Sequence, residues 1–220
     1  MDSTQDYATL KNRQRSERDG WSTNLALRVH RALSWLQRAE LCEDEDGRFI
    51  FLWIAFNAAY ANDIDDRERD PEQKVFNRFL SKLEQLDNGN VLYELIWQEF
   101  SKSVRLLLKN QYVYQPFWDY HNGLLIEEEW KTRFDRANVS ANKALAANQT
   151  ASVLAIVLAR MYTLRNQLIH GGATWNSSVN REQLRDCTAF LGKLVPFVIT
   201  LMMDNPNTLW GDACYPVIEA

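Results

Sequence analysis

Glycine and proline are scarce in this sequence, with eight and five among 220 residues. An all-β domain of this length would need many turn-forming residues, whereas a helical domain joins a few long elements. The shortage of both residue types therefore predicts an all-α fold. The chain is long enough for one large domain with a substantial core.

Cysteine is rarer still. Cys42, Cys187 and Cys214 stand far apart, and none belongs to a C-x-x-C pair. This pattern excludes a disulfide framework or a cysteine-rich zinc site and is typical of reduced cytoplasmic thiols. The sequence also lacks a Gly-rich phosphate loop and the H-E-x-x-H and G-x-S-x-G motifs, so we expect neither a cofactor nor a metal.

An excess of positive charge is missing too. Lys and Arg together number 25 against 29 Asp and Glu, which gives a net charge of -4 at pH 7. This balance excludes a general nucleic-acid binder held by a basic surface. If the protein meets RNA, the contact should be local, at a site that has its own arginines.

Long hydrophobic runs are absent as well. The longest are Phe49–Phe56, Val153–Ala159 and Leu194–Met203. All are shorter than the ~20 residues that cross a bilayer. The first twenty residues are polar, so no export signal is expected. The sequence therefore predicts a soluble, cytoplasmic protein without a membrane partner.

What the sequence does have is apolar spacing typical of helices. A helix should begin near Ser22, with Ser22, Thr23 or Asn24 as its N-cap, and should bury one stripe formed by Leu25, Val29, Leu33 and Leu36. Further helices are expected at Arg48–Asn62, Pro71–Leu86, Val91–Lys109, Thr150–His170 and Arg181–Met203, the last kinked at Pro196. The first of these, Arg48–Asn62, is apolar almost all round and should be buried.

One domain, residues 21–204, is expected between a flexible arm at 1–20 and a tail at 205–220. Residues 62–148 should form an elaborated insert of helical and irregular structure. Within it we expect a charged loop at Asp63–Asp70, irregular structure at Tyr112–Tyr120, and a short helix with a polar loop at 121–148. The aromatic stretch Tyr112–Tyr120 could stack RNA bases, or it could simply pack the insert onto the rest.

The helix Thr150–His170 carries the candidate site. Arg165 interrupts its apolar stripe, and a guanidinium there is costly to bury unless a carboxylate, a phosphate or a second subunit receives it. Asn166 and His170 are four residues apart and share a face. Arg165 and His170 point about 140° apart, with ~7.5 Å of rise between them. They can meet through the long arginine side chain, or at a seam where a second copy packs.

Arginine and histidine suit metal-independent cleavage of RNA by its own 2′-hydroxyl group. An imidazole gains or loses a proton near neutral pH and can take one proton and give another. A guanidinium can stabilise the charge on the phosphorane through charge-assisted hydrogen bonds. Asn166 could orient the imidazole or hold a phosphate oxygen.

The segment Arg165-Asn166-Gln-Leu-Ile-His170 resembles the R-x-x-x-x-H motif of the HEPN superfamily, which lies late in a helix that another helix follows. The stretch Phe51–Tyr60 looks like the second helix of Apea-like and related bacterial HEPN domains. The resemblance covers Phe49–Tyr60 and about Val153–Met203. Residues 62–148 have no counterpart.

The resemblance implies an up-and-down helical bundle that forms a homodimer. It also implies an endoribonuclease acting on RNA in a toxin–antitoxin or phage-defence setting, with an antitoxin or the product of a neighbouring gene as a further partner. Arg165 and His170 would be catalytic, with Asn166 in a supporting position. Toxins silenced by a partner nucleotidyltransferase carry Tyr two residues after the His, where this chain has Gly172, so that mode of control is not expected.

Two alternatives stay open. The chain could be a non-catalytic HEPN module for dimerisation or nucleotide binding, with Arg165 in a salt bridge and His170 capping its helix. Burial of both groups with carboxylate partners would favour that interpretation. Asn57, alone in an apolar helix, could support the site by lining its cleft, or it could be a satisfied buried amide.

Overall fold

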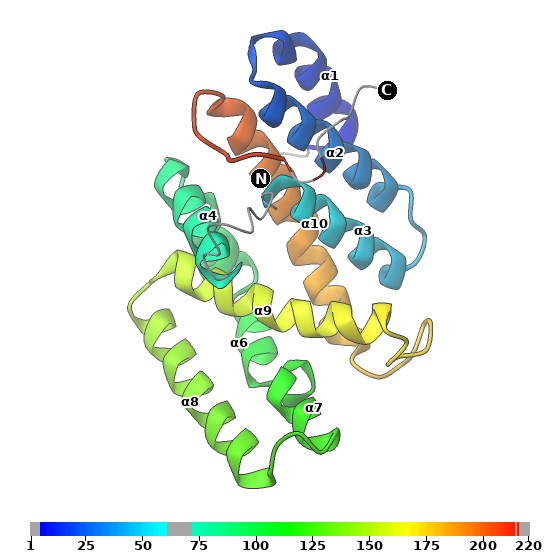
Figure 1. The fold of residues 1–220 in the computed structure, drawn as a ribbon, viewed down its shortest axis with the longest axis vertical. Helices are drawn as coiled ribbons and strands as arrows, with labels where there is room; N and C mark the ends of the chain where they lie inside the picture. Colours follow the sequence, from blue (N-terminus) through cyan, green and yellow to red (C-terminus); the bar gives the residue numbers. More distant parts are fainter. Residues whose placement is uncertain (1–4, 61–71, 214, 216–220) are drawn as a thin grey trace. The chain divides into compact units, whose positions relative to one another are not determined.

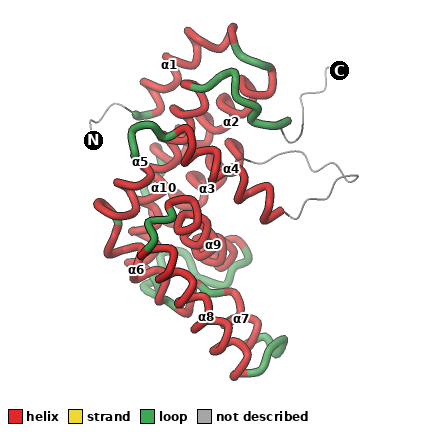
Figure 2. Tube along the Cα trace, turned by 90° about the vertical axis from the view of Figure 1, so that its left-hand side faces the viewer, coloured by secondary structure: helices red, strands yellow, loops and turns green. Residues whose placement is uncertain are grey.

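The computed structural model describes residues 5–60, 72–213 and 215, and all regular structure in this part of the chain is helical (Figures 1 and 2). The α-helices are α1 Tyr7–Glu17, α2 Thr23–Glu40, α3 Glu45–Tyr60, α4 Glu72–Leu86, α5 Val91–Glu94, α6 Ser101–Lys109, α7 Gln115–His121, α8 Glu127–Ala146, α9 Thr150–Ile169 and α10 Arg181–Asp204. The prediction of an all-α fold is confirmed. The expected charged loop Asp63–Asp70 lies outside the described residues.

The helices form two compact units. One combines residues 1–86 with 187–220, and the other comprises residues 87–186. Helix α10 therefore begins in the second unit and continues, from Cys187 onward, in the first. The candidate residues Arg165, Asn166 and His170 belong to the second unit, whereas Asn57 belongs to the first.

Helices α2 and α3 pack along each other in the first unit. Ser22 caps α2 as expected, its hydroxyl accepting a hydrogen bond from the backbone N–H of Leu25 at 3.3 Å. The predicted stripe is buried: Leu25, Val29, Leu33 and Leu36 are all at most 2% exposed. Helix α3 begins three residues earlier than expected, because the carboxylate of Asp44 accepts from the N–H of Gly47 at 2.8 Å and caps its first turn.

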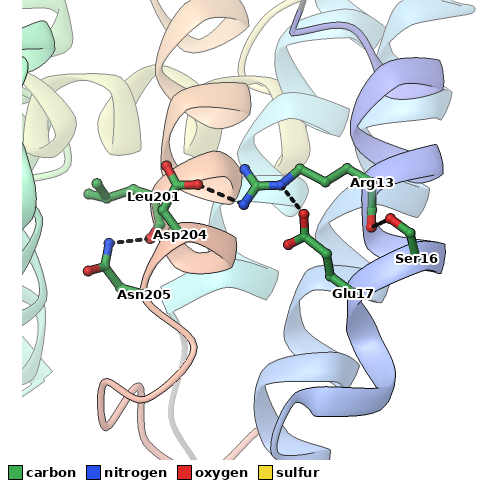
Figure 3. Close-up of polar contacts among 6 residues, drawn as sticks. All are labelled: Arg13, Ser16, Glu17, Leu201, Asp204 and Asn205. Atoms are coloured by element: carbon green, nitrogen blue, oxygen red, sulfur yellow. Dashed lines mark hydrogen bonds and ion pairs between the residues drawn. The ribbon is translucent and has the colours of Figure 1, made fainter.

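Helix α1 occupies a segment where a flexible arm was expected. Asp6 caps it by accepting from the N–H of Thr9 at 2.9 Å. Arg13 then pairs with Glu17 at 2.8 Å and with Asp204, at the end of α10, at 2.7 Å (Figure 3). The helix buries little apolar surface, so the sequence contains no hydrophobic stripe from which this helix could be predicted. A partner 191 positions away in the sequence helps to hold it.

Residues 205–213, which follow α10, pack against the rest of the first unit. Trp210 is 6% exposed, and its indole N–H donates to the carbonyl of Asn205 at 3.0 Å. The Arg28 guanidinium, 1% exposed, donates to the carbonyl of Ala59 at 2.8 Å and to that of Asp212 at 2.6 Å. Arg28 thus connects α2 to the end of α3 and to the C-terminal segment.

The second unit contains more helix than the sequence suggested. The stretch expected to be irregular, Tyr112–Tyr120, forms a 3-10 turn and helix α7, with Pro116 in the first helical turn, where its missing N–H costs nothing. Residues 127–146, expected to hold a short helix and a polar loop, form the 20-residue helix α8. Its buried residues, Trp130, Ala141, Ala144 and Leu145, lie toward its two ends, and none of residues 131–140 between them is buried, so no continuous helical period indicated the helix.

Two other expectations on helices had partial outcomes. The helix expected at Val91–Lys109 is divided by a π-helical turn at Leu95–Glu99, after which the N–H of Phe100 bonds the carbonyl of Leu95 at 3.0 Å. Helix α10 continues through Pro196. It is long and apolar enough to cross a membrane by length and composition, but 72% of its most apolar window is buried inside the protein. A core helix has this property.

Arg28→Ala should destabilise the protein by about 2–4 kcal/mol, because it removes a buried side chain and leaves the buried carbonyl of Ala59 and the partly buried carbonyl of Asp212 without this donor. Urea unfolding measures the change. Arg31→Ala is the matched control, since Arg31 also donates to a carbonyl of the C-terminal segment, that of Tyr215, but in an exposed position. Equal losses for the two variants would contradict the role assigned to burial.

The stability of the first unit should fall as the pH drops below neutral. His30 Nδ1 lies 3.2 Å from Lys11 Nζ, and a neutral imidazole accepts that hydrogen bond whereas imidazolium cannot. Burial and the nearby charges of Lys11 and Arg18 lower the pKa of His30 below its ordinary 6.5. The folded state therefore binds fewer protons than the unfolded state just below pH 6.5, and stability is lost as pH falls through that window.

Thermal unfolding between pH 7.5 and pH 5 checks this expectation. His30→Gln keeps a polar side chain but does not titrate, so it should flatten the part of the pH dependence that His30 contributes. An unchanged pH profile in His30→Gln would assign the dependence to other groups.

Candidate functional site

Helix α9 positions the candidate site by burying most of its length. Six apolar side chains, Val153, Leu154, Val157, Leu158, Met161 and Leu164, are at most 3% exposed. The helix ends where the sequence predicted. Gly171 follows His170 with φ +70°, a conformation that glycine adopts without strain, and its N–H bonds the carbonyl of Leu168 at 3.3 Å.

Arg165 is half-buried in the last turns of α9. Its Nη1 donates to Oδ1 of Asn166 at 2.9 Å, and its Cζ lies 5.8 Å from the centre of the Tyr162 ring. Its Nε is buried and has no hydrogen-bond partner within the described chain, nor does any carboxylate there form an ion pair with Arg165. The guanidinium is therefore partly desolvated without an anion to compensate it.

His170 caps α9 with its backbone and leaves its side chain exposed. Its N–H bonds the carbonyl of Asn166 at 3.0 Å. The imidazole makes no hydrogen bond or ion pair to any residue that the structure describes. Both ring nitrogens are therefore available to exchange protons with a ligand.

The structure brings Arg165 and Asn166 together but does not join either side chain to the His170 ring. Asn166 was expected to orient the imidazole or to hold a phosphate oxygen. Its amide oxygen instead accepts from Arg165, so Asn166 positions the guanidinium. The separation of Arg165 and His170 around the helix is that of residues five apart, about 140°.

Gln167 is a positioning residue that sequence reasoning did not single out. Its side-chain amide donates to the carbonyl of Tyr112 at 2.5 Å, and its backbone carbonyl accepts from the N–H of Ala173 at 3.1 Å. It therefore fastens two segments to the helix end: the turn at 111–113 and the loop that follows His170. No local pattern indicates this role, because one of its partners lies 55 residues away.

A second arginine of α9 is more deeply buried and has a structural role. Arg160 is 4% exposed, its Cζ lies 4.2 Å from the centre of the Tyr114 ring, and its Nη2 donates to the carbonyl of Leu108 at 3.4 Å. That carbonyl belongs to the last turn of α6, where a cation is favoured. Burial lowers the pKa of Arg160 to about 10, so it stays protonated at neutral pH.

None of the other candidate residues forms a hydrogen bond or ion pair with Arg165 or His170 within the described chain. Asn57 is half-buried on α3, and its Oδ1 is a buried atom without a hydrogen-bond partner among the described residues. Glu127, the first residue of α8, pairs with Lys131 at 2.5 Å. The His121 ring packs against the Phe117 ring, with 4.4 Å between centroids. Within the described residues, no group of three or more His, Cys, Asp and Glu side chains could hold a metal ion.

No family model, curated protein or solved structure matches the chain significantly. The likeness to the HEPN superfamily therefore rests on the residues of Phe49–Tyr60 and Val153–Met203 alone. The chemistry available at the end of α9 depends on the exposed imidazole of His170 and the uncompensated guanidinium of Arg165.

Arg165→Ala and His170→Ala should each change the free energy of unfolding by less than about 1 kcal/mol, because neither side chain is fully buried and neither forms an ion pair. Arg160→Ala should cost roughly 2–4 kcal/mol, because it opens a buried space and removes the donor to Leu108. Urea unfolding of the three variants gives the comparison. If Arg165→Ala were as damaging as Arg160→Ala, Arg165 would be a structural residue.

Proposed function

We propose that this protein is a metal-independent endoribonuclease of the HEPN type, with Arg165 and His170 as its catalytic residues. The observation that carries the proposal is the pair of groups at the end of α9: an exposed imidazole without a partner and a half-buried guanidinium without a carboxylate. If these two groups formed structural salt bridges, they would not be available to bind a ligand. A guanidinium without a carboxylate and an exposed imidazole near the end of the same helix suit an anionic substrate that reacts by proton transfer.

The reaction forms one bond and breaks one. The 2′-oxygen attacks the adjacent phosphorus while a base takes the 2′-hydroxyl proton, and the bond from phosphorus to the 5′-oxygen breaks as an acid protonates that oxygen. The products are a 2′,3′-cyclic phosphate and a 5′-hydroxyl end. His170 supplies the base or the acid, and Arg165 stabilises the charge on the phosphorane oxygens. Asn166 holds the guanidinium through its 2.9 Å hydrogen bond.

A homodimer would complete this arrangement. One His170 cannot serve as base and acid on opposite sides of one phosphorus at the same moment, but two copies provide two imidazoles. On α9, Tyr162 and Ile169 are 50% and 45% exposed and lie one turn before and one turn after Arg165. A second copy covering these apolar side chains would enclose the two arginines and two histidines in one cleft. The setting we propose is cytoplasmic, in toxin–antitoxin or phage defence, with an antitoxin or neighbouring-gene product as a partner.

The second candidate is a non-catalytic module of the same type that dimerises or binds a nucleotide. The lack of any contact between Arg165 and His170 favours it, because an arginine alone is enough to hold a phosphate group. In that case the exposed imidazole would have no chemical role, and replacing it would leave binding unchanged.

Cleavage of total RNA by the purified protein in EDTA tests the proposal. The parent should cut RNA and leave cyclic-phosphate ends, whereas His170→Ala and Arg165→Ala should each lose about 100-fold or more in rate. His121→Ala and Arg136→Ala are matched controls from the same unit and should cleave at the parental rate. End analysis of the fragments identifies the cyclic phosphate, and sedimentation measures the oligomeric state.

Mixing His170→Ala with the parent adds a test of a shared cleft. If the one cleft of a dimer needs both imidazoles, heterodimers lack one of them and are inactive, so an excess of His170→Ala should lower the activity of the parent, whereas an excess of His121→Ala should not. Intact RNA from all five folded proteins would reject the nuclease and favour the binding module.

A further inference from the structure

Two exposed aromatic side chains are fastened to the helix turn that leads to His170. Tyr112 is 47% exposed and Trp175 is 74% exposed. Gln167 holds both segments: its side-chain amide bonds the carbonyl of Tyr112, and its backbone carbonyl bonds the N–H of Ala173, two residues before Trp175. Because Gln167 and His170 are three residues apart on α9, their side chains are neighbours on the helix surface.

Hydrogen bonds hold both aromatic residues in defined turns. The N–H of Tyr112 bonds Oδ1 of Asn110 at 2.9 Å, and its carbonyl also accepts from the Trp118 indole at 2.8 Å. The Tyr112 ring rests edge-on against the Phe117 ring, with 5.4 Å between centroids. These contacts therefore fix the orientation of Tyr112, while almost half of its surface is exposed to solvent.

The Trp175 loop is ordered by its backbone, not by burial of its tryptophan. The N–H of Ser177 bonds the carbonyl of Thr174 at 3.1 Å, and Arg181 Nε donates to the carbonyl of Ser177 at 2.8 Å. The indole itself makes no hydrogen bond or ring contact to any described residue. A large apolar side chain is thus displayed on a well-defined turn, five residues after His170.

We propose that Tyr112 and Trp175 are base-stacking residues that hold single-stranded RNA near the phosphate at His170. RNA as the ligand rests on the proposed function, whereas the platform itself follows from the two exposed rings and their common anchor, Gln167. Aromatic rings stack on any base, but only when the base is out of a duplex. The platform therefore selects single strands and has little preference for sequence.

The charge of the protein makes such a platform necessary. With a net charge of -4 the surface offers little general attraction to a phosphate backbone. A single guanidinium at Arg165 would hold a strand only weakly. Two stacked bases supply the remaining affinity without a basic surface.

The test is a binding measurement that does not need cleavage. The probe is a fluorescein-labelled single strand of 2′-O-methyl RNA about 12 nucleotides long, which has no free 2′-hydroxyl and stays intact. Trp175→Ala and Tyr112→Ala should each raise its Kd about 5- to 100-fold at fixed salt. Trp175→Phe and Tyr112→Phe keep a ring and should restore most of the affinity.

Controls separate stacking from loss of structure. Tyr215→Ala removes an 86% exposed aromatic side chain from the other unit and should leave Kd unchanged. A duplex of the same 2′-O-methyl sequence should bind equally to all variants, because its bases are already stacked. Unchanged thermal unfolding of each variant excludes a folding defect, and the Phe variants decide the matter if an Ala variant unfolds early.

The outcomes distinguish this proposal from the nuclease. Binding that depends on both rings, without cleavage of ordinary RNA, would support the platform and reject the nuclease. RNA cleavage that requires His170, together with a Kd that is unchanged when either ring is removed, would support the nuclease and overturn the platform. A parent protein that does not bind the single strand at all would also overturn the platform.

Discussion

The cost of taking a guanidinium out of water shapes both units of this protein. That cost is several kcal/mol unless the N–H donors meet acceptors. Arg28 donates hydrogen bonds to the carbonyls of Ala59 and Asp212. Arg160 donates to the carbonyl of Leu108 and lies over the face of the Tyr114 ring. In each case the arginine joins segments that are distant in sequence. These two buried arginines thus connect helices to other segments of their units.

Arg165 departs from that pattern, and the candidate site depends on the difference. Its only hydrogen bond within the described chain is to its neighbour Asn166, so it connects nothing and remains available for an anion. The adjacent Gln167 makes the long-range contacts of this turn instead, to the Tyr112 turn and to the loop after His170. Structural and chemical roles are therefore divided between consecutive residues of one helix.

Features that depend on neighbouring residues could be predicted well. Ser22 caps α2 because its own hydroxyl reaches the N–H of Leu25, and α9 stops because Gly171 adopts a positive φ. The stripe from Leu25 to Leu36 is buried because a 3.6-residue period puts it on one face. Helix α8 was not predicted because its buried contacts are sparse. Helix α1 was not predicted because an ion pair between Arg13 and Asp204, and not an apolar stripe, helps to hold it in place.

The sequence by itself determined the all-α class, the start of α2, the ends of α9, and the position of Arg165, Asn166 and His170 in the last turns of one helix. These follow from backbone conformation and from spacing within a few residues. Only the tertiary structure decided that Arg160 is buried against distant segments whereas Arg165 is half-buried with its neighbour Asn166 as hydrogen-bond partner, since both arginines sit in similar apolar sequence. It also decided that Gln167 reaches Tyr112, because a hydrogen bond across 55 residues depends on packing that no local pattern records.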